Sequence, residues 1–158
     1  MFRPIRRKEK EIGMQAAKEL LHSARRGVLA VNGDDGYPYG IPINYLYDEE
    51  NETILFHGSC AGHKAEAINR CDKVCFTVVS GETVKEEAWA PYLKSVVVFG
   101  RCHPVEERET AMAAVKRFAM KYYPDEQTAD EEIRRSGRAV RMYAIKIEHI
   151  SAKEIQER

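Results

Sequence analysis

A run of residues near the middle of the chain has the types and spacing of a phosphate-binding site. His57 ends a short apolar stretch, Gly58 and Ser59 follow it, and His63 and Lys64 open an alanine-rich segment with helical spacing. The first turn of a helix presents unpaired backbone N–H groups and the positive end of the helix dipole to an anion. A lysine beside that turn adds a point charge that suits a dianion. The residues therefore indicate a cradle for the phosphate of a cofactor.

The same side chains also have ordinary structural interpretations, which the sequence leaves open. His57 is alternatively a strand-end residue that hydrogen bonds a carbonyl group, His63 a helix cap, and Lys64 a solvated surface lysine. The imidazole group titrates near neutral pH, so His57 is in addition a candidate proton donor to a reduced substrate. We take His57 as the candidate catalytic residue.

The spacing also raises a zinc hypothesis. His57, Cys60 and His63 follow one another at three-residue intervals, but structural zinc needs four ligands, usually in two close pairs. The only further candidates are Cys71 and His103, so we expect no metal site. We expect free, mostly buried thiols in a reducing compartment at Cys60, Cys71, Cys75 and Cys102.

Length and charge limit the possible partners. The chain has 158 residues, enough for one domain with a proper core. Its 25 Lys and Arg residues equal its 25 Asp and Glu residues, and a basic cluster from Arg3 to Lys10 is offset by Glu9 and Glu11. No apolar run approaches the roughly 20 residues of a membrane span, and the N-terminus is charged, unlike a secretory signal. We expect a cytoplasmic protein without a nucleic-acid or membrane partner.

The residues of the predicted phosphate site must be positioned by the strands and helices around them, most of which are short. Alternating hydrophobicity and turn residues predict strands at 28–31, 37–47, 53–57, 74–79, 95–101 and 139–147. Pro38 and Pro42 put the second of these at an edge or a bulge, and the β-branched run from Ser95 to Arg101 should be buried on both faces. Helices are predicted at 8–26, 62–70, 105–123 and 130–135. Residues 80–94 should form a loop or short helix, and residues 151–158 a polar tail.

The order and spacing of these elements predict the fold class. Short strands separated by residues that favour turns are typical of a closed or nearly closed antiparallel barrel. The prediction is a mainly β fold with α-helices, a six-stranded antiparallel barrel with peripheral helices. No linker or repeat divides the chain, so residues 1–158 form a single domain.

Several blocks of sequence together carry a family resemblance. They are RRKEKEI at 6–12, GVLAVNGDDGYPYGIPINYLYD at 27–48, FHGSCAGHK at 56–64, KVCFTVV at 73–79, YLKSVVVFGR at 92–101 and IKIEHISAK at 145–153. In this order they resemble the flavin-binding split-barrel proteins related to pyridoxamine 5′-phosphate oxidase, and more narrowly the nitroimidazole-resistance branch. The resemblance covers nearly the whole chain and implies a split barrel.

The resemblance also implies a cofactor and a dimer. In such proteins two subunits pack together and FMN, or sometimes FAD, lies in a groove between them. The residues implied along the isoalloxazine ring are Ile43, Asn44 and Tyr45. Those implied at the ribityl chain and phosphate are His57, Gly58, Ser59, His63 and Lys64. Those implied from the facing subunit are Tyr92, Ser95 and Val96. Tyr45 and Tyr92 are alternatively ordinary core or interface aromatics, and Trp89 covers the flavin or only anchors its loop.

The function implied is an FMN-dependent oxidoreductase that reduces small electron-poor compounds such as nitroaromatics. A hydride would arrive from NAD(P)H, bound transiently because the chain lacks a GxGxxG fingerprint. Pyridoxamine phosphate is a poorer candidate substrate, since the late part of the chain offers only Arg134, Arg135 and Arg138 as a basic cluster. The alternatives are a non-catalytic module that stores flavin or senses its redox state and, more distantly, a dimerisation scaffold with an empty groove.

Overall fold

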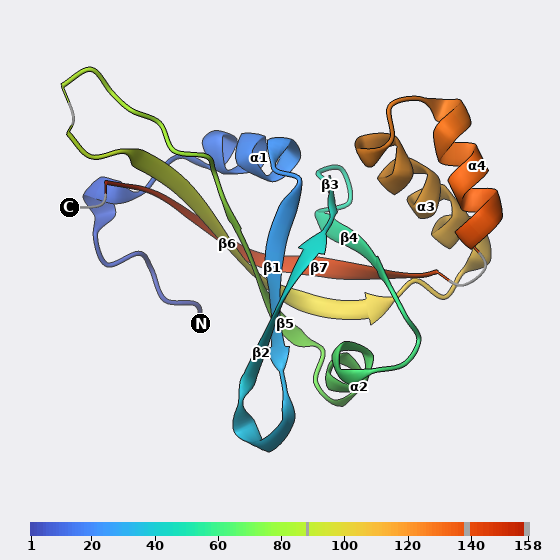
Figure 1. Ribbon diagram of the computed structural model, residues 1–158. Helices are drawn as coiled ribbons and strands as arrows, with labels where there is room; N and C mark the ends of the chain where they lie inside the picture. Colours follow the sequence, from blue (N-terminus) through green and yellow to red (C-terminus); the bar gives the residue numbers. More distant parts are fainter. Residues whose placement is uncertain (88, 138–139, 157–158) are drawn as a thin grey trace.

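The computed structural model describes residues 1–87, 89–137 and 140–156. Its centre is one antiparallel sheet of seven strands in the order β2-β1-β5-β6-β7-β4-β3, which curls into a half-barrel (Figure 1). The strands are β1 (Arg26–Asn32), β2 (Pro38–Asn44), β3 (Leu46–Asp48), β4 (Thr53–Gly58), β5 (Lys73–Val79), β6 (Tyr92–Pro104) and β7 (Arg141–Gln156). The α-helices are α1 (Met14–Ser23), α2 (His63–Arg70), α3 (Arg108–Tyr122) and α4 (Glu126–Ser136).

Alternation along the strands builds the core. Every second residue of β1 and β5 points inward and is buried, as the side chains of Leu29 and Phe76 illustrate. Helix α1 packs its apolar stripe, including Leu21, against this concave face. Helices α3 and α4 form a second layer outside β4 and β7, where Phe118 and Met142 belong to a separate apolar cluster.

The predicted split-barrel class is confirmed, but the strand count of six is wrong. The predicted strand at 37–47 is two strands, because the chain leaves the β1 ladder after Asn44 and pairs with β4 from Leu46 onward. Between them the side chain of Tyr45 turns into the core. The edge position of β2 fits the prediction made from Pro38 and Pro42.

The predicted polar tail is wrong as well. Strand β7 continues to Gln156 because β6 extends back to Tyr92 and pairs with it along this edge, with Ser95 opposite Lys153 and Tyr92 opposite Gln156. The predicted helix 8–26 is also wrong in extent: residues 8–10 form a 3-10 turn, and α1 begins only after Gly13.

The prediction that β6 is buried on both faces is also wrong. Its inward residues Val96 and Val98 are fully buried, but Phe99 on the outer face stays 38% exposed with the ring of Phe2 stacked against it. The predicted start of the last strand at residue 139, together with residues 138 and 158, lies outside the described residues.

Two general features complete the fold. None of the helices that the structure describes is long and apolar enough to cross a membrane. The four cysteines are free thiols, of which Cys102 is buried and Cys60 exposed.

Candidate functional site

Four of the predicted site residues meet at one end of the half-barrel. A depression of about 450 Å³ is lined by Arg26, Pro42, Ile43, Asn44, His57 and Lys64. The β1–β2 register explains this, because Arg26 lies opposite Asn44 and Gly27 opposite Ile43. Sequence reasoning missed Arg26 and Pro42 as site residues, although pairing residues outward from the hairpin turn would have placed Arg26 opposite Asn44.

Lys64 brings an ammonium group to the depression. It lies in the first turn of α2, and a Cβ atom added to Gly58 would come within 3.2 Å of its Nζ. The Nζ is 5.4 Å from the centroid of the Phe56 ring. Within the described residues Lys64 makes no ion pair, and partial burial lowers its pKa below the ordinary lysine value. A cation held in this way favours a bound anion.

The start of α2 is shaped to leave backbone donors free. Gly62 precedes the helix with φ +102°, a conformation that favours glycine, and no side chain caps the first turn. The hydroxyl of Ser59 accepts a hydrogen bond from the Ala61 N–H at 3.2 Å, which tightens the loop leading into the helix. These features agree with the sequence prediction of an anion cradle.

His57 lies at the boundary between two cavities. One is the polar depression, and the other is an apolar pocket of about 170 Å³ between β4, α3, α4 and β7, whose lining includes Val115, Phe118, Ala119, Ile133, Val140 and Met142. The imidazole meets the ring of Phe118 edge-on, with centroids 5.0 Å apart. Burial, and then the charge of Lys64, lower the pKa of His57. The imidazole is therefore neutral at pH 7.

The remaining residues of the predicted phosphate end lie around the depression rather than in its lining. His63 stacks on the ring of Tyr39 at 4.1 Å and approaches Asp34 to 3.5 Å, so it leans toward the β1–β2 turn. Gly58 lies beside the Lys64 ammonium. The carbonyl of Ser59 accepts a hydrogen bond from the Tyr143 hydroxyl at 2.8 Å.

The side chain of Tyr45 is part of the core. It is fully buried, its hydroxyl donates to the carbonyl of Leu21 at 2.7 Å, and burial raises its pKa. Helix α3 hydrogen bonds to the backbone of Tyr45. The carbonyl oxygen of Tyr45 accepts from the Tyr122 hydroxyl at 2.5 Å and from the Lys121 Nζ at 3.0 Å. Tyr45 therefore positions the end of β2, and its ring does not face the depression.

The residues predicted from a facing subunit lie elsewhere in this chain. Val96 is fully buried in the core and Ser95 is 9% exposed. Tyr92 lies beneath the Lys85 ammonium, 4.0 Å from its ring centroid. Trp89 is 80% exposed and lines none of these cavities. The contribution of Tyr92, Ser95 and Val96 to a partner's site remains a prediction.

The described residues hold no group of three or more His, Cys, Asp or Glu side chains arranged to bind a metal ion. In particular, the His57 and His63 rings contact different neighbours, Phe118 and Tyr39 respectively. The lining of the depression is polar and includes the cationic side chains of Arg26 and Lys64, which favour an anion.

Comparison with known proteins gives the fold a family. The model of the family described as pyridoxamine 5′-phosphate oxidase matches residues 14–154. No significant match was found among curated proteins. A solved structure of a candidate 5-nitroimidazole antibiotic resistance protein from Bacteroides thetaiotaomicron is similar, with 19% identity, a TM-score of 0.77, and coverage of 91% of this chain and 85% of that chain.

Two further structures share the fold. An FAD-binding protein from Mesorhizobium loti has 21% identity and a TM-score of 0.65, covering 92% of this chain and 97% of that chain. The flavocytochrome Anf3 from Azotobacter vinelandii has 19% identity and a TM-score of 0.74, covering 94% of this chain and 71% of that chain. Since the family model spans nearly the whole chain, the protein belongs to the pyridoxamine 5′-phosphate oxidase family.

Proposed function

We propose that the protein is a flavin-binding oxidoreductase that reduces small electron-poor compounds, with nitroaromatics such as nitroimidazoles as the substrate class. One observation carries the proposal: His57 separates a cationic, polar depression from an apolar pocket. The first suits a phosphate-bearing cofactor, and the second suits a small aromatic ring. A residue that can donate a proton lies between them.

The depression fits the phosphate end of FMN or FAD. Lys64 offers a half-buried ammonium without an ion-pair partner in the described chain, and the uncapped first turn of α2 offers backbone N–H groups. Arg26 and Asn44 add donors on the opposite wall. A structural relative described as FAD-binding and another described as a flavocytochrome support a flavin here. When bound, the flavin would supply the two-electron chemistry, with NAD(P)H as transient donor.

The apolar pocket supports an aromatic substrate. Its volume of about 170 Å³ compares with the roughly 150 Å³ of an apolar cavity that binds benzene. The edge of Phe118 and the neutral imidazole of His57 form one wall. The N–H of neutral His57 would hydrogen bond the polar substituent of the substrate. As that group is reduced, the imidazole would pass this proton on while its other nitrogen takes up a proton from water. The relative described as a candidate nitroimidazole resistance protein makes nitro compounds the first substrates to test.

We also propose a homodimer formed through the outer face of the sheet. Val28, Val79 and Phe99 are 46%, 53% and 38% exposed on the convex side of neighbouring strands. An apolar face of this kind suits an isologous interface between two copies. Ser95 lies on the same face, which supports its predicted contribution to the partner's flavin site.

Turnover separates the enzyme from a flavin store or redox sensor. The flavin-loaded protein is mixed anaerobically with NADH or NADPH and then with a 5-nitroimidazole, and absorbance of the flavin is followed. Reduction of the flavin by the donor and its reoxidation by the nitro compound, repeated over many cycles, is the expected result. A flavin that stays bound yet transfers no electrons to any nitro compound would favour the non-catalytic alternative. His57→Gln should slow the reoxidation step.

A further inference from the structure

The N-terminal segment is anchored to the sheet at both ends. The ring of Phe2 stacks on Phe99 and His149, with centroids 5.4 and 4.8 Å apart. At the other end the N–H of Ile12 donates to the carbonyl of Ala152 at 3.1 Å. The backbone of residues 2–12 is therefore anchored at both ends as a strap along β7, which places the cationic side chains of this segment beside the strand.

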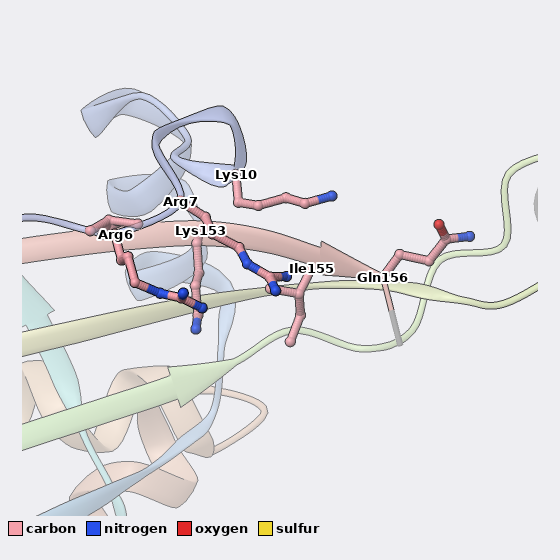
Figure 2. A pocket seen from close by; sticks show the side chains of 7 residues that line it. Arg6, Arg7, Lys10, Lys153, Ile155 and Gln156 are labelled. Atoms are coloured by element: carbon pink, nitrogen blue, oxygen red, sulfur yellow. The ribbon is translucent and has the colours of Figure 1, made fainter. Parts of the chain in front are cut away.

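Strap and sheet together form a basic pocket of about 600 Å³. Its cationic residues are Arg6, Arg7, Lys10 and Lys153 (Figure 2). Figure 2 shows the tips of Arg6 and Lys153 pointing to the same side of the strand, with Arg7 reaching toward Ile155. Ile5 and Ile155 contribute apolar surface, and Gln156 completes the lining.

Within the described residues, none of the four cations of the basic pocket takes part in an ion pair, and Glu154, the neighbour of Lys153, is engaged by Lys85 at 2.7 Å. Glu9 and Glu11 offset the charge of the strap but do not line the pocket, so the positive charge is concentrated in its lining. Like charges gathered in one cavity repel, and an anion with several oxygens removes that cost. Paired guanidinium groups in particular match phosphate oxygens bidentately.

The basic pocket lies on the same face of the sheet as the candidate flavin site. Lys153 is opposite Ser95, Ser95 is opposite Val79, and Val79 is level with Arg26 because Thr77 pairs with Val28. These residues lie on four neighbouring strands, so Lys153 and Arg26 are separated by three strand spacings, about 14 Å. A dinucleotide is long enough to reach from one cavity to the other.

We propose that the basic pocket binds the diphosphate group of a nucleotide. The diphosphate would belong to a nucleotide separate from the flavin, such as the nicotinamide donor, because the flavin's own phosphate is assigned to the depression at Lys64. The identity of the donor rests on the proposed function, whereas binding of the diphosphate does not require flavin to be bound. The strap supplies three of the cations and β7 the fourth.

The test is titration of the apoprotein with ADP by calorimetry, with inorganic phosphate as a weaker comparison ligand. The double variant Arg7→Ala/Lys153→Ala should weaken ADP binding at least tenfold. The matched control Arg3→Ala/Lys8→Ala removes two charges from the same strap at positions that do not line the pocket, and it should bind like the wild type. Unchanged thermal unfolding of both variants establishes that they are folded.

Competition tests whether this nucleotide is separate from the flavin. ADP should bind equally well to the FMN-loaded and the FAD-loaded protein. If FAD blocks ADP binding while FMN does not, the diphosphate in the pocket is the flavin's own, and the assignment to a separate nucleotide is overturned. Equal ADP affinity in the pocket and control variants, or no ADP binding by the wild type at millimolar concentration, would overturn the proposal. The ADP titration of the apoprotein tests the basic pocket even if the protein does not bind flavin.

Discussion

At the scale of single residues, the site depends on two neighbouring groups, His57 and Lys64, whose pKa values both lie below their ordinary values. Lys64 and His57 are both partly buried, and the charge of the first acts on the second. Burial disfavours the charged form of each. A bound phosphate would stabilise the charged form of Lys64 and so offset the effect of burial, because the charges of the phosphate and the ammonium group are complementary.

The pH dependence of stability should report on His57. Its folded pKa lies below the ordinary value of 6.5, so the unfolded chain binds a proton more readily than the folded one. The stability that this group contributes is present above pH 6.5 and is lost as the pH falls through the folded pKa. In His57→Gln, the fall in melting temperature between pH 7.5 and 5 should be smaller than in the wild type. An equal or larger fall in the variant, measured by calorimetry, contradicts this assignment.

At the scale of elements, α3 holds the end of β2 in place. The Tyr122 hydroxyl accepts a hydrogen bond from the Tyr45 N–H at 2.7 Å and can donate to the carbonyls of Tyr45 and Arg25, 2.5 and 2.6 Å away. This contact fixes the break between β2 and β3. Asn44 and Ile43 of the depression directly precede that break.

Removing this hydroxyl should therefore destabilise the protein. We expect Tyr122→Phe to lower the free energy of unfolding by about 1–3 kcal/mol, because partly buried backbone groups lose their hydrogen-bond partner. Urea denaturation gives the value. Tyr123→Phe is the matched control, since the hydroxyl of Tyr123 makes no hydrogen bond within the described residues. Equal stability of the two variants would show that the contact contributes nothing.

The sequence predicted most elements because their patterns are local. The alternation in β1 and β5, and the proline-marked edge strand β2, can be recognised within a few residues. The end of β7 could not be recognised from a local pattern, since residues 151–156 form a strand because they pair with β6. Four of the residues that line the depression were among the predicted site residues, but Arg26 and Pro42 were not, because their places depend on the β1–β2 register. The burial of the Tyr45 ring depends on tertiary contacts, including the hydrogen bond from its hydroxyl to the carbonyl of Leu21, which a local pattern does not reveal.

At the scale of the whole molecule, the exposed apolar face predicts self-association. We expect the wild type to sediment as a dimer and Val28→Glu to shift it toward monomer, because a charge would be buried in the interface. Val84→Glu is the control: Val84 is 75% exposed but lies in the loop between β5 and β6. A monomeric wild type in analytical ultracentrifugation would contradict the dimer.

The most direct test of the account is an FMN titration of the apoprotein, followed by the visible absorption of bound flavin. The wild type should bind FMN, and Lys64→Ala should bind it about 10- to 100-fold more weakly, as expected when a hydrogen bond to a charged group worth about 1.5–3 kcal/mol is lost. The control Lys73→Ala removes an exposed lysine at the start of β5, which does not line the depression, and should leave the affinity unchanged. A wild type that binds neither FMN nor FAD, or a Lys64→Ala variant that binds as tightly as the control, would contradict the proposed site.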